Sequence, residues 1–293
     1  MVRAQAVLIA LAAAWGTSCA RPVRVVVGSK NFTEQVLLGE IVAQQIEHRM
    51  GIVVERKLDL GGTLLAHEAL VQGAIDLYPE YTGTALTAIL KRPPAARAED
   101  VLQQVRAAYE QKWRLRWLAP LGFDDTFAMM IRGTDARSAK LATLSDAAQA
   151  RTWRLGVGYE FKQRPDGLAG LLRTYNLRTQ GEPVAMDLGL LYTALEKGNV
   201  DMIAANSTDG QAAARDVTVL RDDRHYFPPY QCAIVVREET LRQFPRLAEV
   251  LEELSGRFSD ETMRQLNYQV DGKHVPVAQV ARQFLQKMPR GIR

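Results

Sequence analysis

Two loops of this 293-residue chain carry side chains well suited to hold a small polar ligand. Residues 78–84 (YPEYTGT) combine aromatic, carboxylate and hydroxyl groups, and residues 206–210 (NSTDG) combine amide, hydroxyl and carboxylate groups. Groups of these types can surround a ligand and hydrogen-bond to it. The two loops therefore predict a binding site that is contributed by two distant parts of the chain.

The same sequence pattern precedes both loops. Residues 64–77 (LLAHEALVQGAIDL) and 190–202 (LLYTALEKGNVDM) each predict an amphipathic helix that ends at a glycine, followed by a short apolar strand carrying an aspartate. Further upstream, residues 23–30 and 153–159 each predict a buried strand that opens into a glycine turn. Helix–glycine–strand units are common in α/β proteins, but a matched pair favours two similar α/β halves facing each other across a cleft.

Glycine spacing argues against a nucleotide ligand, and the total charge argues against a nucleic-acid partner. Gly156 and Gly158 would begin a dinucleotide fingerprint, but Phe161 occupies the position of the third glycine. No Gly-Lys-Ser/Thr phosphate loop occurs in the sequence. The formal charge of +4 is small for this length and the basic residues are scattered, so no nucleic-acid partner is expected.

Residues 1–19 predict an export signal. Arg3 precedes an apolar stretch that is too short to span a bilayer and that ends in small residues before Cys19. This position of Cys19 resembles the lipidation site of bacterial lipoproteins, although Gly16 stands where that motif usually has leucine. We expect a protein in the periplasm or on the outer face of the cell membrane, anchored by a lipid on Cys19, with a soluble periplasmic product as the alternative. Cys232 would then have no disulfide partner, and its strand context predicts a buried hydrophobic residue.

Two extended passages flank the second half of the repeat. Residues 122–131 and 226–237 predict strands, and we interpret them as crossovers between two lobes. The first lobe is then expected to comprise residues 23–125 together with 231–293, and the second residues 126–230. The first lobe would therefore be discontinuous in the sequence.

Helices are expected in three further stretches. Residues 98–112 are rich in alanine and glutamine, which favour a helix. Residues 241–258 and 275–288 also predict helices, and we expect both to pack back on the first lobe.

Five motifs, taken in order, resemble the substrate-binding proteins of osmoprotectant ABC importers, a family that handles glycine betaine, choline, carnitine and related quaternary amines. The resemblance implies an α/β, two-lobed periplasmic-binding-protein fold, type II-like, with two crossover strands and a ligand cleft. It also implies that the protein closes on its ligand and docks on a membrane permease that has a cytoplasmic ATPase. We expect a monomer that needs no cofactor or metal. The motifs are residues 28–35 (GSKNFTEQ), 78–84 (YPEYTGT), 164–167 (RPDG), 207–210 (STDG) and 227–230 (FPPY).

The resemblance also implies which residues hold the ligand. A trimethylammonium group has no hydrogen to donate, so it must be held by aromatic faces. By motif position, Tyr81 and Tyr230 match two tyrosines of the family's cation cage. Lys30 and Thr84 would contact the ligand's carboxylate from the first lobe, and Arg164 from the second. Each also has an ordinary alternative, such as a packing tyrosine at Tyr81 or a solvated lysine at Lys30.

Two positions depart from the family's pattern. Phe127 replaces a common tyrosine and keeps the aromatic face without the hydroxyl, whereas Asn206 stands where a cage tyrosine is usual. An aromatic contact contributes roughly 0.5 to 2 kcal/mol at such a site. The sequence therefore predicts either weaker betaine binding or a change of ligand to an amine or larger zwitterion that can hydrogen-bond to Asn206.

Catalysis and sensing are the alternatives to transport. The sequence has no Gly-x-Ser-x-Gly elbow, and adjacent aspartates such as Asp124 and Asp125 are interpreted as loop charges, so no enzyme is expected. A sensory lipoprotein that presents its ligand to a receptor remains a second alternative. No metal site is expected, because the four histidines lack the spacing of metal ligands: His48, His67, His225 and His274.

Overall fold

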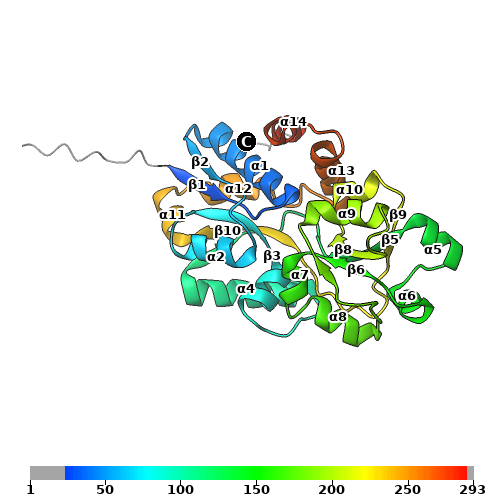
Figure 1. Cartoon of the computed structure of the whole chain (residues 1–293). Coiled ribbons are helices and arrows are strands. Elements are labelled where there is room, and N and C mark those ends of the chain that lie inside the picture. Colours follow the sequence, from blue (N-terminus) through cyan, green and yellow to red (C-terminus); the bar gives the residue numbers. More distant parts are fainter. Residues whose placement is uncertain (1–23, 289–293) are drawn as a thin grey trace, which may run out of the picture.

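Residues 24–288, the part of the chain that the computed structural model describes, form two α/β lobes that lie side by side (Figure 1). Each lobe is built on one five-stranded sheet. The two-lobed α/β architecture expected from the sequence is therefore confirmed. The export signal and the lipidation site predicted at Cys19 lie outside the described residues. Among the helices of residues 24–288, none is both long and apolar enough to cross a bilayer.

The sheet of lobe 1 contains β1 (Val25–Gly28), β2 (Val54–Lys57), β3 (Leu77–Tyr81), β4 (Leu115–Trp117) and β10 (Cys232–Arg237). Their order across the sheet is β2-β1-β3-β10-β4. β1 is parallel to β2 and β3, whereas β10 is antiparallel to its neighbours β3 and β4. A strand from late in the chain thus occupies a central position.

The sheet of lobe 2 contains β5 (Phe127–Arg132), β6 (Leu155–Val157), β7 (Val184–Ala185), β8 (Met202–Asn206) and β9 (Val217–Leu220). Their order, β7-β6-β8-β5-β9, repeats the order of lobe 1 strand for strand. β6 is parallel to β7 and β8, and β5 is antiparallel to β8 and β9. The repeat found in the sequence is therefore also a repeat of topology.

Helices pack against both sheets, with the green and yellow segments forming lobe 2 in Figure 1. Lobe 1 contains α1 (Thr33–Met50), α2 (Thr63–Val71), α3 (Thr82–Thr84), the π-helix η1 (Ala85–Ile89), α4 (Ala98–Trp113), α11 (Glu238–Gln243), α12 (Leu247–Glu252), α13 (Asp260–Asp271) and α14 (Val277–Lys287). Lobe 2 contains α5 (Gly133–Ala139), α6 (Leu144–Ala150), α7 (Tyr159–Gln163), α8 (Leu168–Tyr175), α9 (Leu188–Glu196) and α10 (Gly210–Ala213).

β10 is apolar from Cys232 to Val236 because both faces of the sheet are covered there. In β10, Cys232 and Ile234 belong to the core under α1, whereas Ala233 and Val235 belong to the core on the opposite face. Strands buried on both faces are expected to be continuous apolar runs. Cys232 is fully buried and free, as its strand context predicted.

The aspartate repeated in the two halves has the same structural role in both. In lobe 1, Asp76 Oδ2 accepts a hydrogen bond from the Val26 backbone N–H at 2.7 Å. In lobe 2, Asp201 Oδ2 accepts from the Arg154 backbone N–H at 3.4 Å and also pairs with the Arg154 guanidinium. Asp76 therefore ties the segment before β3 to β1, and Asp201 ties the segment before β8 to the beginning of β6.

The chain crosses between the sheets twice, and the two crossing segments lie next to each other. Asp124 and Gln231 form an antiparallel bridge, and the Tyr230 backbone N–H donates to Asp124 Oδ2 at 2.9 Å. The strands are shorter than predicted, since β5 begins at Phe127 and β10 begins at Cys232. Two consecutive prolines precede β10, and proline has no N–H for a sheet ladder. The exact lobe boundaries stay a prediction.

The C-terminal region is helical but divided differently from the prediction. α4 and α14 match the predicted helices closely, but the helix predicted over 241–258 is wrong. Pro245 separates α11 from α12, because proline cannot continue a helix and disfavours helical geometry in the preceding residue. α13, which follows α12, was not predicted as a separate helix.

The two lobes also touch through α10 and α13. In Figure 1 the yellow α10 lies beside the brown α13. A Cβ atom at Gly210 would lie only 2.3 Å from the Tyr268 backbone nitrogen. Glycine at this position therefore permits close packing between a helix of lobe 2 and a helix of lobe 1.

Candidate ligand-binding site

A cavity of about 790 Å³ lies between the lobes, and residues of both lobes line it. Its walls come from the loops at the carboxyl ends of β1, β3, β6 and β8, where ligands commonly bind in α/β sheets. The structure brings together every residue that the motifs predicted to contact the ligand. These lining residues are Lys30, Tyr81, Thr84, Phe127, Arg164, Asn206 and Tyr230.

Tyr81 forms an aromatic wall on the lobe 1 side. Its hydroxyl donates to Glu34 Oε1 at 2.7 Å, and its ring stacks on Phe32 with centroids 6.3 Å apart. Lys30 Nζ lies 4.8 Å from the ring centroid. Phe32 also lines the cavity and was not predicted, although it lies in the motif that contains Lys30.

Lys30 is buried, so the alternative of a solvated lysine is wrong. The residue is 3% exposed, and Lys30 Nζ lies 2.5 Å from Glu80 Oε1. Lys30 Nζ also donates to Thr63 Oγ1 at 3.3 Å. Glu80 is fully buried and accepts a further hydrogen bond from the Tyr78 hydroxyl. The positive charge of Lys30 is thus compensated inside the protein.

Arg164 is held in a similar way in lobe 2. Its Nε and Nη2 donate to the two oxygens of Asp166 at 2.9 and 2.5 Å, and its Nη1 donates to Thr84 Oγ1 at 3.1 Å. The guanidinium carbon lies 4.9 Å from the Phe127 ring centroid. Burial opposes the ionisation of Asp166, but hydrogen bonds from Arg164 and Tyr230 hold its pKa below the ordinary value. Arg164 therefore pairs with Asp166, but in the cavity wall and not on the surface.

Phe127 and Asn206 lie opposite each other on neighbouring strands. They are register partners of β5 and β8, so their side chains lie on the same face of the sheet. Phe127 packs edge-on against Phe161, with centroids 4.8 Å apart, and Arg164 lies over its ring. Asn206 makes no side-chain hydrogen bond to the described residues and leaves this wall polar.

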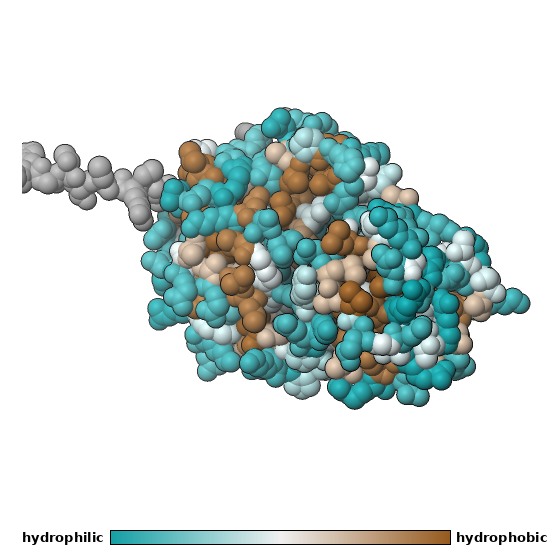
Figure 2. Space-filling view, viewed as in Figure 1, coloured by the Kyte–Doolittle hydropathy of each residue, from teal (hydrophilic) through white to brown (hydrophobic). Residues whose placement is uncertain are grey.

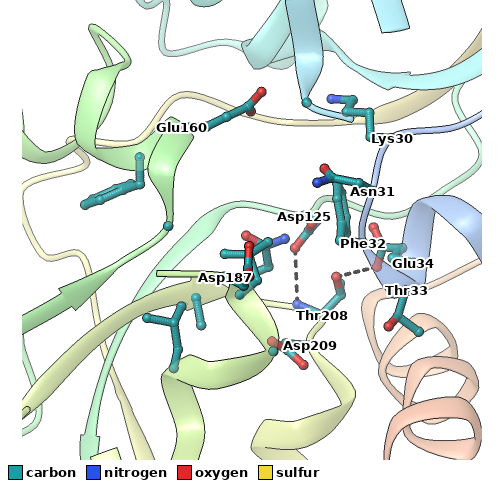
Figure 3. A pocket seen from close by; sticks show the side chains of 18 of the residues that line it. Lys30, Asn31, Phe32, Thr33, Glu34, Asp125, Glu160, Asp187, Thr208 and Asp209 are labelled. Atoms are coloured by element: carbon teal, nitrogen blue, oxygen red, sulfur yellow. Dashed lines mark hydrogen bonds between the residues drawn. The ribbon is translucent and has the colours of Figure 1, made fainter. Parts of the chain in front are cut away.

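A buried polar cluster joins the lobes around Thr208, as Figure 3 shows. The Thr208 hydroxyl donates to Glu34 Oε2 at 2.6 Å, and its backbone N–H donates to Asp125 Oδ1 at 3.3 Å. Burial raises the pKa of Glu34, and burial together with the charge of Glu34 raises the pKa of Asp125 well above its ordinary value. Asn267 donates to Glu34 from α13 at 2.9 Å.

Sequence reasoning missed three residues of this cluster. Glu34 lies within the predicted motif 28–35 but received no role. Asp125 was interpreted as a loop charge, yet it is only 7% exposed and lines the cavity. Asn267 lies in a C-terminal helix far from the other motifs, so only the three-dimensional structure brings it to the site.

The charges in the cavity wall are distributed unequally. Both cations are paired with carboxylates behind the wall, Lys30 with Glu80 and Arg164 with Asp166. Among residues 24–288, just one acidic lining residue has a basic group within 4.0 Å, namely Glu160, which lies 4.0 Å from Arg164. The acidic lining residues are Glu34, Asp59, Asp125, Glu160, Asp187, Asp209 and Asp271.

Three further hydrogen bonds connect the lobes beside the cavity. The Thr63 backbone N–H donates to Glu160 Oε1 at 2.5 Å, and Thr63 Oγ1 donates to Glu160 Oε2 at 3.0 Å. The Thr87 hydroxyl of η1 donates to Asp166 of lobe 2 at 2.8 Å. These contacts describe lobes that have closed around the cavity.

The entrance of the cavity is apolar, in contrast to its charged interior. Leu65 and Tyr159 line the cavity and are 63% and 56% exposed, and Leu188 lines it from α9. Leu64 and Leu190 are exposed next to them in α2 and α9. Figure 2 shows hydrophobic surface on both lobes of this face.

Two matched α/β lobes closed around a polar and aromatic cavity define a bilobal solute-binding protein. The chain belongs to the OpuAC family, described as the substrate-binding domain of ABC-type glycine betaine transport systems, which matches residues 23–287. The resemblance to osmoprotectant-binding proteins of ABC importers is therefore confirmed. Within the described residues, no group of three or more histidine, cysteine, aspartate or glutamate side chains is arranged to hold a metal ion.

Similar proteins support this assignment. The chain is 35% identical over 267 residues to the ergothioneine transport permease/ergothioneine binding protein EgtU of Helicobacter pylori, covering 90% of this chain and 47% of that protein. The chain thus spans about half the length of that relative. It is 32% identical over 264 residues to the carnitine transport binding protein OpuCC of Listeria monocytogenes, covering 89% and 85%. A crystal structure described as a glycine betaine/carnitine/choline ABC transporter matches with a TM-score of 0.76 and 32% identity, covering 90% of this chain and 98% of that one.

Proposed function

We propose that this protein captures a small organic cation or zwitterion between its lobes, outside the cytoplasm, and delivers it to the permease of an ABC importer without catalysing a reaction. Quaternary amines and betaines are the first ligand class to test. The relatives named for ergothioneine and carnitine support this class, because both of those compounds carry a trimethylammonium group and a carboxylate.

The unequal distribution of charge in the cavity is the observation that carries the proposal. Lys30 and Arg164 already have buried carboxylate partners, whereas six of the seven acidic lining residues have no cation within 4.0 Å among residues 24–288. A cationic ligand would favour the ionised form of these carboxyl groups and compensate their charge, whereas an anionic ligand would be repelled by those that are ionised. Tyr81 and Phe32 supply aromatic faces on the same cavity.

The proposal can be tested by thermal-shift and calorimetric titration of the purified protein. The compounds are glycine betaine, choline, carnitine, proline betaine, ergothioneine and a set of amino acids. A ligand at a hundred times its dissociation constant adds about 2.7 kcal/mol of stability. Binding of an organic cation or zwitterion supports the proposal, and a response confined to anionic solutes would overturn it.

Variants of Tyr81 locate the binding in the cavity. Tyr81→Ala removes the aromatic face and should abolish the response to a quaternary amine. Tyr81→Phe keeps the face, removes the hydrogen bond to Glu34 and serves as the matched control. Equal loss in the two variants would argue against a role for the aromatic face.

The proposal includes a monomer held at the outer face of the cell membrane by a lipid on Cys19. This part rests on the sequence around Cys19 and on the extracytoplasmic location of ABC-importer substrate-binding proteins. Mass spectrometry of the membrane-bound protein should find a lipid on this residue, and Cys19→Ser should release the protein into the soluble fraction. An unmodified Cys19 in the membrane fraction would contradict this part alone.

A further inference from the structure

We propose that Glu160 holds the two lobes closed over a bound ligand, by accepting hydrogen bonds from Thr63 at the entrance of the cavity. We call this contact the latch. Glu160 is then a positioning residue, which slows the release of the ligand without having to contact it. The inference rests on the proposed function, because it assigns one residue a role in capture at the same cavity.

The same kind of contact joins the lobes twice, once in each direction. Glu34 is the second residue of α1 in lobe 1, and it accepts a hydrogen bond from the Thr208 hydroxyl of lobe 2 at 2.6 Å. Glu160 is the second residue of α7 in lobe 2, and it accepts from the Thr63 hydroxyl of lobe 1 at 3.0 Å. α1 follows β1 and α7 follows β6, and these strands have corresponding places in the two sheets. Each lobe thus contributes one glutamate that binds a threonine of the other lobe.

The two glutamates differ in their surroundings. Glu34 is 3% exposed, and its partner Thr208 also contacts Asp125 in the first crossing segment. The side chain of Glu160 is 42% exposed and lies beside the exposed Tyr159 at the entrance. Figure 3 shows Glu160 well apart from Glu34. A rotation of the lobes about the crossing segments therefore separates the latch first, and water can solvate Glu160 when it does.

Helix α2 depends on Glu160 for the cap at its N-terminus. Its N-cap residue is Gly62, which has no side chain to accept from the free N–H groups of the first turn. Glu160 Oε1 accepts from the Thr63 backbone N–H at 2.5 Å instead. A carboxylate is favoured at a helix N-terminus by the helix dipole. Lobe 2 therefore supplies the cap that α2 does not provide for itself.

Gly62 is the observation that carries the inference. Its backbone angles, φ −76° and ψ −176°, are open to any residue, so the conformation does not require glycine. A Cβ atom at this position would lie 2.3 Å from Glu160 Oε1, and the next two nearest atoms also belong to Glu160. Glycine at position 62 therefore makes room for the carboxylate of the opposite lobe.

The partners of Glu160 are held in place by the cations of the cavity wall. Lys30 Nζ donates to Thr63 Oγ1 at 3.3 Å, which leaves the hydrogen of that hydroxyl to donate to Glu160 Oε2. Arg164 Nη1 lies 4.0 Å from the same carboxylate oxygen. The carboxylate of Glu160 is thus placed between a cation of each lobe, and its hydrogen bonds are strengthened by its charge.

Release kinetics test the latch. Release of radiolabelled carnitine, and of each other compound of the panel that binds, is followed after dilution, and the dissociation constant is measured by calorimetry. Glu160→Ala should raise the dissociation rate constant about tenfold and leave the association rate constant nearly unchanged, because the latch forms after the ligand has entered. Glu160→Gln keeps an acceptor for the Thr63 N–H and should raise it only about threefold. Glu182→Ala removes the same charge from an exposed position outside the cavity and should change neither rate.

Gly62→Ser breaks the latch from the opposite lobe and keeps both of its partners. Serine is a favourable N-cap, so α2 retains a stable N-terminus, but the new Cβ atom displaces Glu160 Oε1. Release should accelerate about as much as in Glu160→Ala, while the midpoint of thermal unfolding without ligand stays the same. Combining the two substitutions should add little, since both break one contact.

The outcomes separate this inference from the proposed function. Unchanged release from Glu160→Ala and Gly62→Ser would overturn the inference and leave the proposed function intact. A change confined to the association rate constant would also overturn it, because it would assign Glu160 to the entry of the ligand. Failure of the unmodified protein to bind any organic cation or zwitterion of the panel would overturn the inference and the proposed function together.

Discussion

The two lobes of the molecule share a framework and differ at the ends of two corresponding strands, β3 in lobe 1 and β8 in lobe 2. Both sheets have corresponding strand orders, and both use an aspartate, Asp76 at β1 and Asp201 at β6, to hold the beginning of a strand. β3 ends in Tyr81 and β8 ends in Asn206, so lobe 1 gives the cavity an aromatic wall and lobe 2 gives it a polar one. A repeated scaffold can therefore present different chemistry through one position in each half.

The halves also resemble each other in how they hold a cation in the cavity wall. Lobe 1 pairs Lys30 with Glu80, and lobe 2 pairs Arg164 with Asp166. In both, the carboxylate lies behind the cation and has a tyrosine hydroxyl as a further donor. The comparison shows that both cations are paired with carboxylates of the protein framework.

Breaking these buried pairs should have the largest effect. Glu80→Ala and Asp166→Ala each leave a buried cation without a partner, which typically costs about 3 to 5 kcal/mol. Urea unfolding should show comparable losses in the two halves. Asp216→Ala is the control, because the Asp216–Arg137 pair is exposed and contributes little to stability. A loss below about 1 kcal/mol for either buried pair would contradict its role in the framework.

The contact between the halves at Gly210 can be broken by a single methyl group. Gly210→Ala would place a Cβ atom 2.3 Å from the Tyr268 backbone nitrogen, so α10 and α13 must separate. We expect at least a tenfold loss of affinity for the tightest ligand of the panel and a larger radius of gyration in X-ray scattering with ligand. Gly189→Ala is the control, since no heavy atom lies within 4 Å of its added Cβ. Unchanged affinity in Gly210→Ala would show that closure tolerates this separation.

Replacing Asn206 at the end of β8 with tyrosine makes this position match Tyr81 at the end of β3. Asn206→Tyr supplies an aromatic face opposite Tyr81 and should raise the affinity for glycine betaine about tenfold, which corresponds to about 1.4 kcal/mol. Asn206→Leu removes the amide without adding an aromatic face, so it separates the loss of the polar group from the gain of the ring. No gain on calorimetric titration of Asn206→Tyr would refute the idea that this position tunes the ligand.

The smallest expected effect is a pH dependence of cation binding. Burial raises the pKa of Asp209 to about 6, and burial also raises the pKa values of Glu34 and Asp125. As the pH falls through about 6, Asp209 gains a proton, so the cavity loses negative charge. Affinity for choline, whose charge does not change with pH, should therefore fall severalfold from about pH 7.5 to pH 5. Tighter binding at pH 5 would reverse this sign and contradict the assignment.

Much of the fold and site could be predicted because the informative residues lie in local patterns. Helix–glycine–strand units revealed the two halves, and the motifs beside the strand ends contained or adjoined the predicted lining residues. Lys30, Tyr81 and Asn206 all follow or end a strand, and strand ends converge on one edge of a sheet. Such positions can be found without knowledge of tertiary contacts.

The partners of those residues could not be predicted, because they depend on contacts between distant segments. Lys30 meets Glu80 fifty residues away, and Asn267 reaches the cavity from α13 near the end of the chain. The burial of Asp125 likewise depends on packing between the crossing segments and lobe 2. Sequence identifies a charge, but only the surrounding structure decides whether it is solvated or compensated.

The central position of β10 sets the order in which the lobes can be completed. β10 pairs with β3 and β4 in the middle of the lobe 1 sheet, although it follows β3 by more than half of the chain. All the strands of lobe 2 lie between β4 and β10 in the sequence, so that sheet can assemble without any later residue. In lobe 1, β4 instead has no neighbouring strand in the sheet until β10 arrives, and closing so long a loop slows folding. Lobe 2 is therefore expected to fold first, and lobe 1 to complete its sheet around the returning strand.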